Sequence, residues 1–174
     1  MFEFEKLLSS TSPGLPVMTL RGSPIPTLSE LNLAPSDRKT WQRLAASHKS
    51  WLERRVPTAR YNCAGLAWSS RRTWVDSADQ TVDLIRVEDQ YSVLPRTTEA
   101  IREGDLVVYF LAGQGARRQF FHVGQVVSIG QGNPWEANTL VLSKFGWGAE
   151  VRHFLHEIPD RGFQYIEHEF WRES

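Results

Sequence analysis

The apolar positions in the first half of the chain recur at helical spacing. Ser36-Asp37 opens the first predicted helix and Pro57 stops it, because proline lacks the N–H that a helix interior needs. The apolar stripe of this helix consists of Trp41, Leu44, Ala45, His48, Trp51 and Leu52. Two further helical pieces are predicted, an amphipathic helix over Ala78–Asp89 and a single turn over Thr98–Arg102.

From Gly104 onward the period changes to the alternation typical of strands. Glycine-rich turns such as Gly113-Gln114-Gly115 separate the apolar runs. Strands are predicted over Asp105–Leu111, Gln119–Ser128, Thr139–Lys144, Glu150–His156 and Phe163–Trp171. Helices followed by an antiparallel meander predict an α+β fold, with the N-terminal helices packed on the sheet.

The first 35 residues have a different composition from the rest. Residues 9–35 are rich in Ser, Thr, Pro and Gly, and only Pro16–Leu20 is expected to form a short strand. We therefore expect an extended N-terminal arm over residues 1–35, draped over a single α+β domain over residues 36–174. A chain of 174 residues is long enough to bury a sizeable core.

Charge and cysteine content limit the function classes. Lys plus Arg and Asp plus Glu both number 20, so the net charge is zero and a nucleic-acid partner is disfavoured. One cysteine excludes an internal disulfide. The N-terminal residues lack the pattern of a signal peptide, and no stretch reaches the length of a membrane span. We expect a chain that is cytoplasmic as synthesised, with export by a route that needs no signal peptide left open.

The only cysteine lies in the stretch Tyr61–Trp68. Asn62 is a good helix N-cap, and the residues after Cys63 continue readily as an apolar helix. Cys63 is then in the first turn, where free N–H groups and the helix dipole stabilise an anion and favour a thiolate nucleophile. The alternative reading is that Cys63 is a small buried hydrophobe, as most free cysteines are.

A thiolate nucleophile needs a base, and among the five histidines His122 has the most suggestive context. It lies in the predicted strand Phe120–Val127, directly after the hairpin that begins with Gly104-Asp105-Leu106. His122 and Gly124 face the same side of this strand. The small Gly124 leaves room for a helix start to approach, so His122 could reach Cys63. An ordinary surface histidine on a half-buried strand is the alternative.

The order of these motifs resembles papain-like cell-wall cysteine peptidases of the NlpC type and the related CHAP amidases. The resemblance covers residues 58–145 and rests on the helix "NCAGLAW", the strand "GDLVVYF" and the strand "FHVGQVV". It implies a papain-like fold in which Cys63 is the nucleophile and His122 the base. Asn62 and Ala64 depart from the residues usual beside the NlpC cysteine. The later segment "SKFGWG" with His153 is more similar to a sparsely characterised bacterial group that pairs an "NC" helix with an "SK-x-G … H" segment.

The resemblance also indicates where the remaining site residues belong. The residue that orients the histidine lies on the strand after the histidine strand, which offers Ser143 by position and, just beyond the turn, Glu150 by chemistry. The oxyanion hole would use the Cys63 backbone N–H, with Asn62 or Tyr61 beside it. Lys144 is assigned to substrate contact or to the exposed surface, and Trp147 in the following turn is a further candidate for substrate contact.

The sequence thus predicts a cysteine hydrolase that cleaves an amide bond. The resemblance implies peptidoglycan stem peptides as substrate, and a bacterial toxin or effector, checked by an inhibitor or immunity protein, would use the same machinery. No cofactor is expected. His153 and His156 are three apart, which suits one metal site poorly on a strand, so no metal is expected either. The competing hypothesis is a non-catalytic module with an SH3-like hairpin core that binds peptide or another macromolecule.

Overall fold

The structure is a computed structural model that describes residues 14–29, 33–95, 101–112, 118–132, 138–159 and 166–174. Its helices are α2 (Pro35–Ser47), α3 (Cys63–Trp68) and α4 (Asp79–Glu88). Its strands are β1 (Val17–Met18), β2 (Pro24–Ile25), β3 (Thr27–Leu28), β4 (Leu52–Arg55), β5 (Trp74–Val75), β6 (Tyr91–Val93), β7 (Leu106–Leu111), β8 (Gln119–Ile129), β9 (Thr139–Lys144), β10 (Glu150–Phe154) and β11 (Ile166–Glu173).

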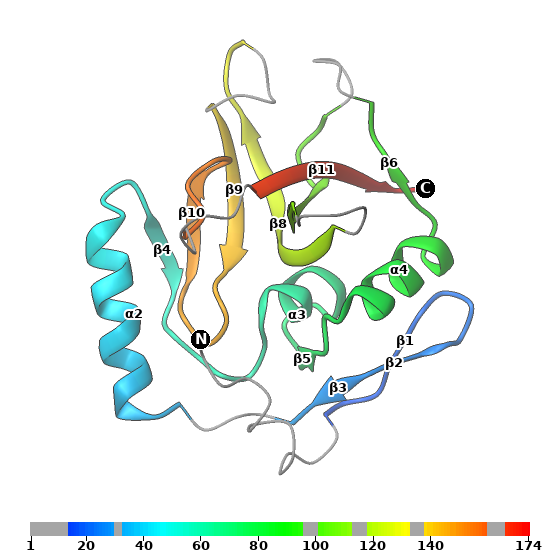
Figure 1. Cartoon of the computed structure of the whole chain (residues 1–174), viewed down its shortest axis with the longest axis horizontal. Helices are drawn as coiled ribbons and strands as arrows, with labels where there is room; N and C mark the ends of the chain where they lie inside the picture. Colours follow the sequence, from blue (N-terminus) through cyan, green and yellow to red (C-terminus); the bar gives the residue numbers. More distant parts are fainter. Residues whose placement is uncertain (1–13, 30–32, 96–100, 113–117, 133–137, 160–165) are drawn as a thin grey trace.

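The described strands from β4 onward, apart from β5, form one antiparallel sheet in the order β4-β10-β9-β8-β7-β11-β6 (Figure 1). Strands β7 to β10 follow the chain as a meander. The last described strand, β11, is inserted between β7 and β6. All six residues of β7 are buried, because this central strand is covered on both faces.

Side chains from the two faces of the sheet enter different parts of the core. One face packs on α3 and contains Val108 and Val123 together with Cys63, and we call it the Cys63 face. The other face contains Tyr109 and Val141 and is covered mainly by loop residues. Since His122 pairs with Tyr109 across β7 and β8, it belongs to this second face, the His122 face.

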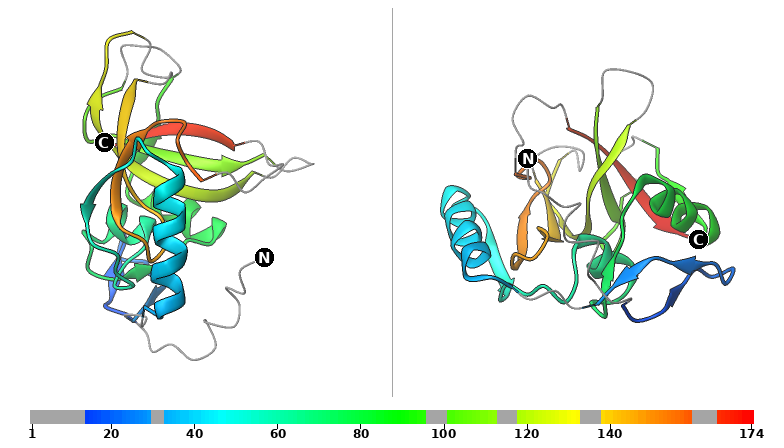
Figure 2. Two further views of the ribbon diagram at one scale, coloured as in Figure 1. Left: turned by 90° about the vertical axis from the view of Figure 1, so that its left-hand side faces the viewer. Right: turned by 60° about the horizontal axis from the view of Figure 1, so that its bottom comes forward.

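The helices lie at different places along the sheet. Helix α2 runs beside β4 and β10, where Trp41 packs on Ala149 and Val151, whereas α3 and α4 lie together below β8 (Figures 1 and 2). Residues 14–29 of the N-terminal arm are anchored beside α3 and α4. Its buried Val17 and Ile25 pack against α3 and α4.

The α+β class predicted from the sequence is confirmed, with mixed helices and antiparallel strands. The first helix was predicted to run to Pro57 but ends at Ser47, and residues 52–55 form edge strand β4 instead. The predicted strand over Thr139–Lys144 matches β9. The predicted turn over Thr98–Arg102 and the start of the last predicted strand fall largely outside the described residues.

Candidate functional site

Cys63 is the first residue of α3, as the N-cap prediction requires. The Asn62 side-chain oxygen accepts a hydrogen bond from the Gly65 N–H at 2.8 Å, and its amide nitrogen donates to the Val75 carbonyl at 2.8 Å. The side chain of Asn62 is therefore engaged twice, once as the helix cap and once in fixing α3 to β5. No room is left for a Cβ at Gly65, which would lie 2.2 Å from the Thr73 carbonyl.

The thiol of Cys63 is buried, with 8% of the residue exposed. Burial raises its pKa, and the backbone N–H groups of Val123 and Ala64 and the charge of Lys144 oppose this rise. The opposing groups show what surrounds the sulfur: the first turn of α3, the backbone of β8 and an ammonium. The thiol thus lies against Val123, the residue that follows His122.

Lys144 is fully buried, so the exposed surface predicted as one of its two alternatives is wrong. Its ammonium donates hydrogen bonds to three backbone carbonyls, those of Thr58 at 2.7 Å, Gly146 at 2.9 Å and Gly148 at 2.6 Å. It also lies 5.1 Å from the centre of the Tyr61 ring. Lys144 thereby ties the turn between β9 and β10 to the segment that leads into α3.

Glu150 is also buried on the Cys63 face, opposite Lys144 in the β9–β10 register. Its carboxylate accepts hydrogen bonds from the Tyr61 hydroxyl and from the Arg71 guanidinium, the latter at 2.6 and 3.3 Å, and Arg55 lies 3.7 Å away. Burial alone would raise the pKa of this carboxyl, but these bonds hold it below its usual range. Glu150 orients Tyr61 and Arg71 and makes no hydrogen bond to His122.

His122 is 4% exposed, and its Nε2 atom has no hydrogen-bond partner in the described part of the chain. Burial, together with nearby His153, lowers its pKa well below the ordinary value, so the ring is neutral. The gap predicted at Gly124 is filled by β9: a Cβ there would lie 2.4 Å from Ser143 Oγ. The start of α3 approaches from the opposite face, and no hydrogen bond joins Cys63 to His122 among the described residues.

The ring of His122 ends a stack of four rings on the His122 face. Its centroid lies 4.5 Å from that of Phe145, which stacks on Trp51 at 4.8 Å, which in turn stacks on His48 at 4.1 Å. The interplanar angles are 16°, 11° and 22°. This stack joins β8, the β9–β10 turn and the end of α2, and it fixes the plane of the imidazole.

Ser143 is engaged with a different histidine from the one predicted. Its hydroxyl donates to Nε2 of His153 at 2.9 Å, and Nδ1 of that ring donates to the Phe154 carbonyl at 2.7 Å. Burial lowers the pKa of His153 to about 4. The motif "SK-x-G … H" has a structural basis here. On one face of β9 Ser143 fixes His153, and on the other face Lys144 fixes the turn between β9 and β10.

The structure brings Tyr61, Cys63, Lys144 and Glu150 together on one face of the sheet, with Arg71 beside them. His122 and Ser143 lie on the other face. Trp147 packs against Trp41, Ala149 and Val151, in a cluster that does not contain Cys63. Arg71 and the roles of Thr58 and Gly148 were not predicted from the sequence. The two glycines after Lys144 were the one available signal, since they predict a turn there.

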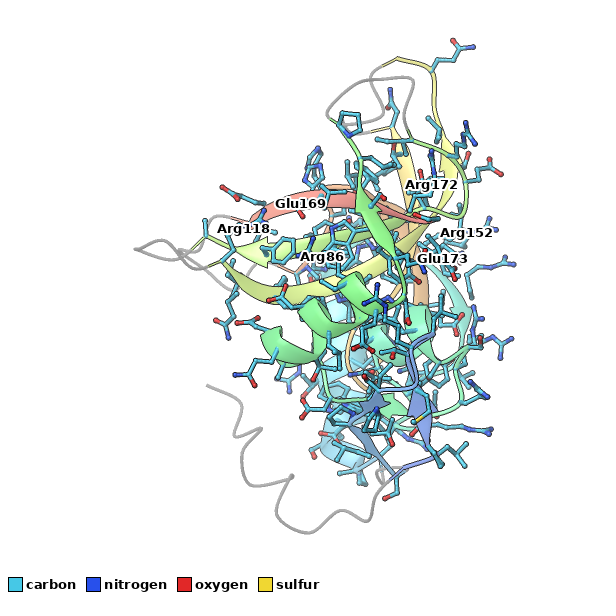
Figure 3. The ribbon with its side chains drawn as sticks, turned by 90° about the vertical axis from the view of Figure 1, so that its right-hand side faces the viewer. Arg86, Arg118, Arg152, Glu169, Arg172 and Glu173 are labelled. Atoms are coloured by element: carbon cyan, nitrogen blue, oxygen red, sulfur yellow. The ribbon has the colours of Figure 1, made fainter. Side chains whose placement is uncertain are left out.

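Two surface cavities lie around Trp171, and neither is lined by Cys63 or His122. The larger, of about 580 Å³, lies among α4, β6, β7 and β11 and is lined by residues that include Arg86, Phe110, Arg118 and Glu169. In it Arg118 covers the Phe110 ring at 4.5 Å and pairs with Glu169 (Figure 3). The smaller, of about 350 Å³, opens beside the ion pair of Arg172 with Asp105.

No cluster of three or more metal-ligating side chains is present within the described ranges. The described helices are all too short or too polar to cross a membrane. Comparison with protein-family models, with curated proteins and with solved structures finds no match to this chain.

Proposed function

We propose that the protein is a cysteine hydrolase of papain-like fold that cleaves an amide bond. The observation that carries the proposal is the contact between α3 and β8. It places the Cys63 thiol at a helix start and against the backbone of Val123, one residue from His122. A cysteine in a first helical turn beside a strand that carries a neutral histidine supports this proposal, because thiol-based acyl transfer uses a thiol and an imidazole base from neighbouring elements.

In the proposed reaction His122 takes the thiol proton and the Cys63 sulfur attacks the amide carbonyl. The developing oxyanion is stabilised by the backbone N–H of Cys63, and His122 then returns the proton to the leaving amine. Water releases the acyl group from sulfur and restores the thiol. Because thiol and ring lie on opposite faces of β8, this mechanism requires a second conformation, populated also without substrate, in which the Cys63 sulfur and the His122 ring meet.

The substrate class that we propose is a peptidoglycan stem peptide, which the motif order around Cys63 and His122 supports. A toxin or effector acting on such peptides would need an inhibitor protein in the cell that makes it. Deamidation or acyl transfer would use the same nucleophile, and the acceptor, water or an amine, would distinguish them.

The test measures iodoacetamide alkylation of Cys63 against pH, followed by hydrolysis of peptidoglycan fragments. We expect His122→Ala to slow both reactions and Cys63→Ala to abolish hydrolysis without unfolding the chain. His156→Ala, which changes an exposed histidine, is the matched control. Undiminished hydrolysis in Cys63→Ala, or alkylation that is slow and unaffected by His122→Ala, would refute the proposal.

The larger cavity favours a second candidate function, peptide binding without catalysis. Its lining combines the rings of Phe110 and Trp171 with guanidinium and carboxylate groups, and aromatic residues and arginine are enriched at protein interfaces. On this hypothesis Arg86→Ala, which removes a guanidinium lying 6.0 Å from the Trp171 ring centre, would weaken peptide binding and leave Cys63 chemistry unchanged. Titration of labelled peptides into both proteins, followed by fluorescence anisotropy, would measure this.

A further inference from the structure

Strand β6 is an open edge of the sheet. It is the last strand in the described order, beyond β11, and Figure 1 shows it at the rim. The Leu94 N–H bonds to the Phe170 carbonyl of β11, and residues of an antiparallel pair alternate, so Ser92 also bonds inward. The N–H and carbonyl of Val93 therefore point away from β11, towards the open side. No turn, loop or neighbouring strand within the described ranges bonds to either group.

The two edges of the sheet are protected differently. At the other edge, three of the four residues of β4 are charged, and α2 lies beside the strand. Charged side chains on an edge strand discourage pairing with another chain. The three residues of β6 are uncharged, and Val93 is 45% exposed. The backbone of β6 is thus available to pair with an added strand.

The larger cavity lies beside this edge. Val93 and its β11 partner Trp171 both line it, because the side chains of directly opposite residues lie on the same face of a sheet. A residue of an added antiparallel strand opposite Val93 would point to this face as well, and hence towards the cavity. The volume of about 580 Å³ is large enough for an aromatic side chain. Figure 3 views the edge from outside and shows Arg86 and Glu169 on one side of β6.

The charges around the cavity favour a neutral aromatic side chain. The lining includes three carboxylates and two guanidiniums, those of Asp79, Asp83, Glu169, Arg86 and Arg118. The carboxylates repel an acidic side chain, and the guanidiniums oppose a basic one. Arg118 pairs with Glu169 at 2.5 Å, whereas Arg86 has no ion pair in the described part of the chain. Arg86 lies 6.0 Å from the Trp171 ring centre and can take the face of a second ring, as Arg118 takes that of Phe110 at 4.5 Å.

We propose that β6 binds an extended peptide as an added antiparallel strand, with an aromatic side chain of the peptide seated in the larger cavity. The inference deepens the second candidate function, on whose cavity it rests, and requires nothing of Cys63. The three residues of β6 span about 10 Å, which suits a short peptide but gives two copies of this chain too little contact for a stable dimer. The backbone of β6 supplies affinity, and the cavity supplies specificity.

The experiment titrates short labelled peptides of alternating Thr and Val, blocked at both ends, into Cys63→Ala, which lacks the proposed nucleophile. The central residue of the peptide is Tyr, Ala, Glu or Lys, and fluorescence anisotropy measures binding. We expect the Tyr peptide to bind most tightly. Methylation of its central backbone nitrogen removes the N–H that pairs with the Val93 carbonyl, so binding should weaken by about tenfold.

On the protein side, Val93→Pro removes the outward N–H of β6 at a position where an edge strand tolerates proline. We expect it to weaken binding of the Tyr peptide by about tenfold. Val93→Thr keeps the N–H and is the matched control. If circular dichroism shows that Val93→Pro does not fold, the methylated peptide decides.

Equal binding of the methylated peptide, tighter binding of the Glu or Lys peptide, or no binding of the Tyr peptide would overturn the inference. A wild-type dimer in sedimentation that Val93→Pro separates would also overturn it, because a second copy would then cover the edge. Hydrolysis of peptidoglycan fragments by the wild type tests the hydrolase separately. Peptide binding at β6 without hydrolysis would support the inference and refute the hydrolase, and hydrolysis without such binding would refute the inference alone.

Discussion

The two faces of the sheet at β8 and β9 bury polar groups in contrasting ways. On the Cys63 face the charged groups of Lys144 and Glu150 have their donors and acceptors filled by backbone carbonyls, Tyr61 and Arg71. On the His122 face the Nε2 atom of His122 has no hydrogen-bond partner among the described residues, and the ring stacks on Phe145. A buried polar group without a partner costs stability. The first face is therefore built to stabilise the fold, whereas the second keeps a free nitrogen at a cost.

The largest effect is expected from breaking the charged network at its centre. Glu150→Gln should destabilise the protein by about 3 kcal/mol, because it leaves Arg71 beside a neutral group that is itself 2% exposed. Urea denaturation followed by tryptophan fluorescence would measure the loss. Glu173→Gln, at an exposed position of β11, should change stability little. A loss no larger than that of this control would show that the network does not stabilise the fold.

The His122 face should make the fold sensitive to acid. His153 has a pKa of about 4 in the folded protein against about 6.5 when unfolded, so the unfolded chain binds more protons between these values. Stability is therefore fully present above pH 6.5 and is lost as the pH falls towards 4, by up to about 3 kcal/mol for this residue.

The unfolding free energy measured between pH 4 and 8 would show this slope. His153→Leu should flatten the slope even though it lowers stability at pH 7, since Ser143 then loses its acceptor. A slope equal to that of the wild type would contradict the assignment of the acid sensitivity to His153.

Tyr61→Phe should have a smaller effect than Glu150→Gln. It removes one hydroxyl donor from the Glu150 carboxylate but leaves Arg71 bound and the ring in place under Lys144. A loss of about 1–2 kcal/mol is expected for a hydrogen bond to a charged group. Thermal unfolding followed by circular dichroism would measure it, and the effects of Tyr61→Phe and Glu150→Gln should be less than additive because they share one bond.

The smallest effect on stability is expected at His122. His122→Phe keeps the stack on Phe145 and removes the unpaired nitrogen, so the free energy of unfolding should stay the same or rise by up to about 1 kcal/mol. Hydrolysis should be lost at the same time. A large destabilisation would mean that the imidazole makes an interaction in the folded state that stacking does not describe.

Local signals were sufficient for the elements that carry the site. Asn62 predicted the start of α3 because N-capping involves residues three apart in the chain. The short apolar run of residues 139–144, followed by the turn at Gly146 and Gly148, likewise indicated β9. Strand β4 was missed because all four of its residues are exposed, which removes the alternation that marks a strand.

The partners of the site residues depend on register, which local pattern does not specify. Ser143 and Lys144 are adjacent in the chain, so their side chains face opposite sides of β9. The register of β9 with β10 then decides that Ser143 meets His153 and that Lys144 lies on the same face as Glu150. The face of the sheet on which α3 packs is likewise determined by tertiary contacts. Because α3 packs on the face opposite to the His122 side chain, Cys63 and His122 are apart, although each lies on the element predicted for it.

The position of β11 has a consequence for how the chain folds during synthesis. Among the described strands, β6, at residues 91–93, pairs only with β11, at residues 166–173, so its partner is made more than 70 residues later. The meander from β7 to β10 can form earlier, since its strands are neighbours in sequence. We therefore expect the sheet of a ribosome-bound chain to be incomplete, with the edge of β7 exposed until β11 emerges. The pairing of β11 with β7 and β6 is then a slow, long-range step.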